Sequence, residues 1–399
     1  MKSVRHHLPE SWSLVFSAFG AAYGVGLLSL WALPFLISAA IADLALDEAQ
    51  AGLLMSAEFL LTMLASLLVA PLMGRAPRRT LALAGTLVAI LANLVSAQLS
   101  DLHALIAVRC LAGAGAGLAL ACGNACVSSA QSPDRVAGHM NVLSVALMIV
   151  VMLSYAKTMA AFGLPGLYYA MAVTMAAMLA FIPFMPARAA APPASAHPAG
   201  GSGRVLLSAS ALCMMAAMFL FQARDTMGWA FVERIGILVG YDGEALGVLF
   251  SLQAFVGLVG PLAAAVIGKR FGMSTPVIIG ILGTGATSLG FVLGEASREM
   301  YTVAVMMICV TYFYALSYLT ALAASLDREG RIVAASGSFL SLGLAVGPAM
   351  SGLLITAGGY TLAAWGIAVV VLLTLACVLV PLAKARQLPA AAPALHAAT

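Results

Sequence analysis

Long apolar runs recur along almost the entire chain, and they constrain its fold more than any other feature. Each run is bounded by Gly, Pro or a charged residue. A helix needs about 20 predominantly apolar residues to cross a bilayer, and it satisfies its own backbone hydrogen bonds in lipid. Only 9% of the 399 residues are charged, against about 25% in soluble domains. This composition excludes a cytosolic enzyme, a nucleic-acid-binding protein and a disordered chain.

The runs predict an all-α polytopic membrane protein with twelve transmembrane helices. The run from Leu14 to Ile41 is too long for the apolar region of a signal peptide, which holds about 7–15 residues, so we expect it to remain as the first span. The expected spans are 13–38, 48–73, 80–99, 103–129, 137–161, 165–186, 206–236, 243–269, 275–294, 299–325, 332–357 and 360–385.

Basic residues are distributed asymmetrically between the predicted loops. With the N-terminus inside, most of the 19 Lys and Arg residues fall on the inner side, whereas outer loops hold acidic residues such as Asp43, Asp47 and Asp101. Because cytoplasmic loops carry an excess of Lys and Arg, we expect both termini to be cytoplasmic. The expected location is a bacterial inner membrane.

Residues 187–204 differ in kind from the other loops, because they are rich in Pro, Ala, Gly and Ser and have almost nothing to bury. We expect a flexible cytoplasmic linker between an N-terminal six-helix bundle, 1–186, and a C-terminal six-helix bundle, 205–399. A shift of 195 residues places Gly52–Glu58 on Gly247–Gln253. This weak internal repeat is typical of transporters built from two parallel repeats, with the substrate site between them.

The six cysteines all fall inside apolar segments, so they do not resemble a secreted disulfide framework. Cys122 and Cys126 lie four residues apart, but neither His nor a carboxylate accompanies them at ligand spacing. We therefore expect buried free thiols, no metal site and no cofactor.

The loop after the second predicted span matches a family pattern. The pattern is Gly-x-Leu-x-Asp-Arg-x-Gly-Arg-Arg, and Leu72, Arg75, Arg78 and Arg79 fit it, while Gly74 replaces the Asp. Arg270 occupies the corresponding place in the second half. Through these residues the chain resembles the major facilitator superfamily over essentially its full length. The resemblance implies a latch on the inner side, and the missing Asp leaves open whether these arginines only set topology.

A second family pattern, Arg-x-x-x-Gly-x-Gly-x-Gly, is matched in the fourth span by Arg109, Gly113, Gly115 and Gly117. In the family this arginine is often linked to proton coupling. The glycines predict close helix packing, because small residues let helix backbones approach in lipid. A dinucleotide-binding interpretation is rejected, since it would need a preceding strand.

A third family pattern marks drug/proton antiporters and ends in Gly-Pro-x-x-Gly-Gly in the fifth span. Residues 137–161 lack it, which weakens the case for drug efflux. The eleventh span holds a similar stretch with Gly347 and Pro348. We interpret these two residues as helix-packing positions.

Few charges lie deep in the predicted spans, where each costs several kcal/mol unless it is paired or faces a cavity. They are Glu58, Arg109, Lys157, Arg224 and Asp225. Glu58 lies roughly 15 Å and Arg109 roughly 9 Å from the outer surface at 1.5 Å per residue. We expect them to pair as a proton-responsive element, with a static ion pair as the alternative. Asp225 is the other candidate for proton coupling.

Substrate-binding candidates come from the spans that line the cavity in the family, namely the first, fourth, seventh and tenth. Four residues of the seventh span are spaced three or four apart and are expected to share one helix face: Gln222, Asp225, Trp229 and Glu233. Arg224 points about 100° away from that face, and its alternative role is to reach the outer surface. The tenth span adds Tyr314 and Tyr318, and the first span adds Tyr23.

These features predict a secondary active transporter working by alternating access, not an enzyme. We expect proton coupling and a small organic anion as substrate, because of the arginines in the spans. Proton-antiport efflux of drugs or metabolites is the alternative. An intramembrane enzyme is disfavoured because no histidine lies deep in a span, and a sensor usually carries a long soluble extension. The expected partners are the solute, protons and the lipid bilayer, with no nucleic acid, and the chain is expected to be a monomer.

Overall fold

The computed structural model describes residues 11–73, 75–128, 130, 132–186, 205–268, 270–294, 297–327 and 330–387. Helices make up nearly all of these residues, and no strand occurs among them. The predicted linker 187–204 lies outside the described residues, so the division into two bundles stays a prediction. Gly74 of the loop motif also lies outside them.

The first part of the chain forms six α-helices and short 3-10 or π segments. Side chains of Ser11 and Asp47 cap the starts of two of them, and Asp47 does so in a capping box with Gln50. The elements are α2 Trp12–Ala21, η1 Ala22–Gly26, α3 Leu28–Leu44, α4 Glu48–Val69, η2 Ala70–Leu72, α5 Arg78–Ser96, α6 Leu102–Ser128, α7 Pro133–Leu179 and η3 Ile182–Phe184.

The second part is also helical, and side chains of Ser208, Asp242 and Ser297 cap three of its helices. The elements are α8 Ala209–Trp229, α9 Val232–Leu238, α10 Gly243–Val256, α11 Val259–Ile267, α12 Ser274–Val292, α13 Arg298–Leu326 and α14 Arg331–Gln387.

The two longest helices each contain a break at glycine. Gly163 in α7 has a φ of 59°, and Gly359 in α14 has a φ of 68°, a region that favours glycine. The Tyr155 hydroxyl donates to Thr174 Oγ1 at 3.0 Å, although 19 residues of straight helix would span about 28 Å. The chain therefore reverses at Gly163, between the predicted spans 137–161 and 165–186.

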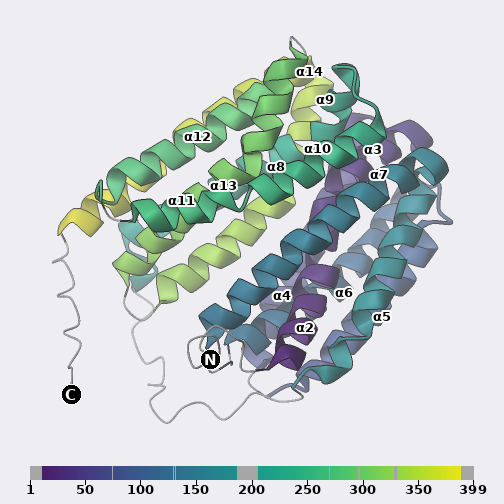
Figure 1. The fold of residues 1–399 in the computed structure, drawn as a ribbon, viewed down its shortest axis with the longest axis horizontal. Helices are drawn as coiled ribbons and strands as arrows, with labels where there is room; N and C mark the ends of the chain where they lie inside the picture. The colour runs from purple at the N-terminus through teal and green to yellow at the C-terminus, as the bar shows by residue number, and fades with distance from the viewer. Residues whose placement is uncertain are drawn as a thin grey trace, which may run out of the picture.

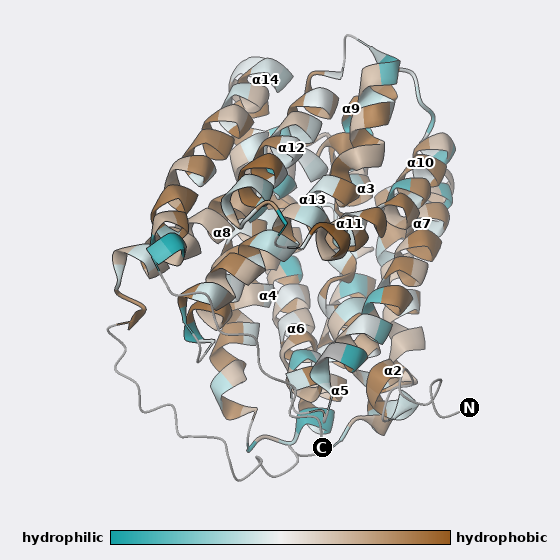
Figure 2. Ribbon diagram, turned by 60° about the vertical axis from the view of Figure 1, so that its left-hand side comes forward, coloured by the Kyte–Doolittle hydropathy of each residue, from teal (hydrophilic) through white to brown (hydrophobic). Residues whose placement is uncertain are grey.

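Nine helical stretches among the described residues are long and apolar enough to cross a membrane. Two of them, Arg135–Phe184 and Arg331–Gln387, contain the glycine breaks. Large apolar side chains such as Leu68, Val173 and Phe162 are about 70% exposed on the outside, and Figure 2 shows apolar residues along most of the length of the helices. Such an apolar surface suits a bilayer. The number of twelve spans stays a prediction.

Figure 1 shows α2–α7 on one side of the molecule and α8–α14 on the other. We call the end with the loop Ala45–Asp47 the acidic end, and the end with Arg75 and Arg78 the basic end. At the acidic end α3 contacts α9, α4 contacts α14 and α7 contacts α10. These pairs connect the two sides of the molecule.

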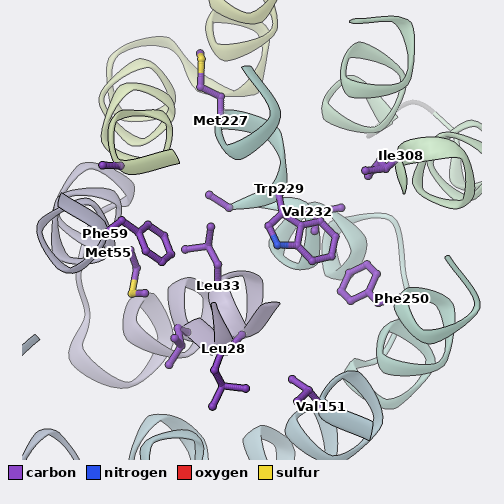
Figure 3. Packing of buried hydrophobic residues seen from close by; sticks show 14 of the residues in the cluster. Leu28, Leu33, Met55, Phe59, Val151, Met227, Trp229, Val232, Phe250 and Ile308 are labelled. Carbon is purple, nitrogen blue, oxygen red and sulfur yellow. The ribbon is translucent and has the colours of Figure 1, made fainter. Parts of the chain in front are cut away.

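Trp229 lies in the apolar core where the two sides meet. Figure 3 shows its indole between Leu33 of α3 and Phe250 of α10. The indole N–H donates to the Leu30 carbonyl oxygen at 2.9 Å, which satisfies the polar edge of this buried ring. This contact ties the end of α8 to α3.

Candidate functional site

Glu58 of α4 and Arg109 of α6 form a fully buried ion pair. Arg109 Nη2 lies 2.5 Å from Glu58 Oε1 and Nε lies 3.0 Å from Oε2, so the pair is bidentate. The two side chains are 1% and 0% exposed, respectively. Bidentate arginine–carboxylate pairs are the stronger kind of ion pair.

The surroundings satisfy both charges of this pair. Ser29 Oγ of α3 donates to Glu58 Oε1 at 2.6 Å, and Arg109 Nη1 donates to Asn93 Oδ1 of α5 at 2.8 Å. The guanidinium also lies over the Tyr168 ring, 4.9 Å from its centre. Side chains from five helices thus meet at one neutral cluster.

Glycines place this cluster by letting helix backbones approach. A Cβ on Gly113 would collide with the Glu58 carbonyl oxygen, and one on Gly117 with the Thr62 carbonyl oxygen. Gly115 packs in the same way against Gly85 of α5. Since Gly113 lies one turn after Arg109, the close approach of α6 to α4 sets the reach of the ion pair.

The eleventh predicted span uses small residues in a similar way. Gly347 packs against Thr226 of α8. On the other side of the helix, a Cβ on Gly52 of α4 would collide with the Pro348 carbonyl oxygen. The first segment of α14 therefore lies between α8 and α4.

Arg224 points to α12 rather than to the centre of the molecule. Its Nη1 donates to Ser288 Oγ at 2.8 Å and lies 3.4 Å from both the Thr284 carbonyl oxygen and Asp225 Oδ1. The guanidinium lies over the Phe221 ring at 5.0 Å, and the residue is 2% exposed. The Asp225 side chain is 17% exposed, so Asp225 is the more accessible charge of the two.

The tenth predicted span meets the seventh through a residue that the sequence did not single out. The Tyr312 hydroxyl donates to Gln222 Oε1 at 2.6 Å, and its ring stacks on Phe221. Tyr314 and Tyr318 instead contact each other, and the Tyr318 hydroxyl donates to the Gly268 carbonyl oxygen after α11. In the sequence, Tyr312 is distinguished only by lying on a different helix face from Thr311 and Tyr314.

The first predicted span has one accessible face. Between Ser17 and Ala40, only Tyr23, Leu27, Leu30 and Trp31 are partly exposed. The rings of Tyr23 and Trp31 stack with 6.1 Å between their centres, and the Tyr23 hydroxyl donates to Asn141 Oδ1 of α7 at 2.9 Å.

A cavity of about 150 Å³ adjoins this face in the basic-end half of the molecule. It lies between α3, α4, α6 and α14 and shares Leu27 and Leu30 with the accessible face. None of the predicted substrate-binding residues lines it, and none of its lining residues is charged. The lining residues are Gly26, Leu27, Leu30, Phe59, Thr62, Met63, Ser66, Leu67, Ala70, Leu120, Ser338, Ser341 and Leu344.

Two similar contacts join helices of the two sides at the acidic end, and we call them the acidic-end seal. In the first, Ser56 Oγ of α4 accepts from the Ala349 backbone N–H at 2.9 Å beside the Gly52–Pro348 contact. In the second, Gly247 of α10 packs on Met152 and Ala156 of α7, and Ser251 lies one turn further along. The 195-residue repeat relates the two glycines and the two serines.

The basic loop residues bind within their own side of the molecule. Arg78 is buried and donates to the carbonyl oxygens of Met73 and Ala125, each at 2.9 Å. Arg79 donates to the Met185 carbonyl oxygen at 2.8 Å. Leu72, Arg75 and Arg270 are exposed.

The described residues contain no group of three or more His, Cys, Asp or Glu that could hold a metal ion. Their six cysteines are free. The functional groups that the described residues offer for binding are therefore carboxylates, guanidinium groups and hydroxyls in an apolar interior.

Three solved structures of transport proteins are similar to this chain. The nucleoside transporter NupG has a TM-score of 0.68 and 15% identity, covering 92% of this chain and 97% of that chain. A bacterial homologue of the human lysosomal transporter Spinster, inward-facing and unoccupied, has 0.72 and 13%, covering 93% and 96%. The D-xylose–proton symporter has 0.67 and 12%, covering 91% and 95%. No curated protein matches the sequence.

The family profile described as Major Facilitator Superfamily matches residues 14–328, which is most of the chain. With its apolar helices, this makes the protein an integral, multi-pass membrane protein. The chain belongs to the Major Facilitator Superfamily.

Proposed function

We propose that the protein is a secondary active transporter that moves a small organic solute by alternating access, driven by protons. The observation that carries this proposal is the contrast between the two ends. The acidic-end seal packs α4 on α14 and α7 on α10, while a cavity separates α4 from α14 in the basic-end half. By the positive-inside rule the basic end is cytoplasmic, so this arrangement is the inward-open state of a cycle in which bundles 1–186 and 205–399 rock against each other.

Proton coupling rests on the Glu58–Arg109 pair, with Asp225 as a second carboxylate. A proton on Glu58 would cancel its charge and leave the Arg109 guanidinium buried without its counter-ion. Breaking one partner of a buried pair costs about 3–5 kcal/mol, which is enough to drive a rearrangement of α4 against α6. The D-xylose–proton symporter, a structural neighbour, is named for the same kind of coupling.

The structure gives little support to an anionic substrate. Arg109 is committed to protein partners. Arg224 points to Ser288 of α12, with its buried Nη2 left without a partner among the described residues, and Lys157 is exposed on α7. The cavity instead combines apolar walls with hydroxyls of Thr62, Ser66 and Ser338, a lining that suits a neutral solute with an apolar part. We therefore favour a neutral solute over the expected anion.

The test starts with a solute screen for thermal stabilisation of the purified protein, followed by flux into proteoliposomes with and without a pH gradient. Glu58→Gln should lower gradient-driven accumulation at least ten-fold while keeping solute exchange, and Lys157→Gln should leave both unchanged. Flux that ignores the pH gradient would exclude proton coupling. The direction of the coupled flux separates uptake by symport from efflux by antiport.

The substrate site is tested by filling the cavity. Ser341→Trp should abolish stabilisation by the solute found in the screen, because the indole would occupy the space between α4 and α14. Leu68→Trp, on an exposed surface of α4, is the matched control. Binding that survives Ser341→Trp would place the site elsewhere, and a screen that selects only anions would restore the original expectation.

A further inference from the structure

A second buried carboxylate lies at the acidic end, apart from the ion pair and the cavity. Glu233 lies in the first turn of α9, just after the break between α8 and α9, and it is 0% exposed. Neither carboxylate oxygen accepts a hydrogen bond of normal geometry, although the Ser38 hydroxyl of α3 lies close by. Its environment is therefore almost without donors.

The groups around Glu233 offer little charge compensation. Arg234 is its neighbour in α9, and Tyr301 of α13 lies close to it with its hydroxyl committed to the Val232 carbonyl oxygen at 2.7 Å. The charged residues on the packed helices are exposed, namely Asp43 of α3, Glu244 of α10, and Arg298 and Glu299 of α13, where Arg298 lies over the Tyr241 ring. The helix α12 has no charged residue.

A comparison with Glu58 shows what this environment favours. Glu58 accepts two hydrogen bonds from Arg109 and one from Ser29, as a buried carboxylate anion requires. Glu233 has no such donors, and an ionised carboxylate buried without them is strongly unfavourable. The site of Glu233 fits the neutral carboxylic acid.

The position of Glu233 links this protonation to the contact between α3 and α9 at the acidic end. Ser38 lies on α3 and Glu233 on α9, and the Trp229–Leu30 hydrogen bond joins α3 to the end of α8, which directly precedes α9. These helices belong to opposite sides of the molecule (Figure 1), so an opening of the acidic end separates them. Water that enters there can then solvate the carboxylate anion.

We propose that Glu233 is a second proton-binding site of the transporter, which takes up a proton when the acidic end closes and releases it to that side when the end opens. This inference rests on the proposed function, because it assumes that the acidic end opens during the cycle. The direction of the effect follows from the chemistry. A higher pH in the solution that the acidic end faces removes the proton from Glu233 and favours the open acidic end. A lower pH in that solution favours the closed acidic end.

Infrared spectroscopy tests the protonation directly, without a substrate. The wild-type protein at neutral pH should show the C=O stretching band of a buried, protonated carboxyl, and this band should vanish as the pH is raised. Glu233→Gln should remove the band, while Glu58→Gln and Asp225→Asn should keep it. A wild-type protein without the band, or a band that disappears only in Glu58→Gln or Asp225→Asn, would overturn the proposal.

The link to the seal is tested by distance measurement between spin labels at Ala42→Cys and Leu238→Cys, two exposed positions on α3 and α9, after replacement of the six native cysteines by alanine. The distance should lengthen as the pH rises through the infrared transition, and it should stay short at all pH values in Glu233→Gln. A distance that ignores the infrared transition would overturn the link. If the variant does not fold, the wild-type pH series alone decides.

The two proposals fail in different ways. If solute flux is independent of the pH gradient while the infrared band and the distance change are still observed, the proton-driven function is wrong. Glu233 is then a pH-dependent conformational sensor without a role in proton-coupled transport. If flux depends on the gradient and the wild-type protein lacks the band, only the Glu233 inference is wrong.

Discussion

At the scale of single residues, Glu58 and Arg109 neutralise each other's charge in the apolar interior of the described N-terminal helices. Arg109→Gln removes the bidentate partner of Glu58, so the buried carboxylate must either stay charged without compensation or bind a proton, and we expect a loss of about 3–5 kcal/mol in the free energy of unfolding. The double variant Glu58→Gln with Arg109→Gln should recover most of this loss, since two amides can hydrogen-bond without a net charge. Thermal unfolding in detergent measures both, and a double variant as unstable as Arg109→Gln would contradict the coupling.

Sequence spacing could predict this pair, because both residues lie at similar depths in long apolar runs. It could not predict that Arg224 turns to Ser288 of α12, since that depends on how α8 rotates against a helix about 60 residues away. The same rotation brings Tyr312 rather than Tyr314 to Gln222. Facing directions between helices are a property of packing, which the apolar pattern of one helix does not determine.

At the scale of helices, glycine sets the distance between α4 and α6. Gly113→Ala should destabilise the protein, because its Cβ would collide with the Glu58 carbonyl oxygen and shift the carboxylate that Arg109 binds. Gly138→Ala is the matched control, since nothing lies within 4 Å of its Cβ position and alanine favours helix by about 1 kcal/mol. Thermal unfolding should therefore move in opposite directions for the two variants, and equal shifts would rule out the packing role.

The apolar runs predict where helices lie, and the Gly and Pro residues between the runs predict the breaks at Gly163 in α7 and Gly359 in α14. The π segment Ala22–Gly26 and the break between Trp229 and Val232 were not predicted. Both lie inside predicted spans and carry no Pro at the irregular point. They arise where the chain meets other helices, as the Trp229 contact with Leu30 illustrates.

At the scale of the whole molecule, the internal repeat predicts that the two contacts of the acidic-end seal act together. Gly52 and Gly247 each leave room for a helix of the opposite side, namely α14 and α7. A tryptophan at either position cannot fit between these backbones, so it should force the acidic end apart while the helices on each side of the molecule keep their own packing. The positions lie away from the cavity and from the Glu58–Arg109 pair.

Gly52→Trp and Gly247→Trp should therefore both lengthen the distance between labels at Ala42→Cys and Leu238→Cys, and the double variant should lengthen it further. The change should occur even at low pH, because steric exclusion of the seal does not depend on the protonation of Glu233. Gly138→Trp, in open space on α7, is the control and should leave the distance unchanged. A short distance in both tryptophan variants, with normal thermal unfolding, would show that these glycines do not hold the acidic end closed.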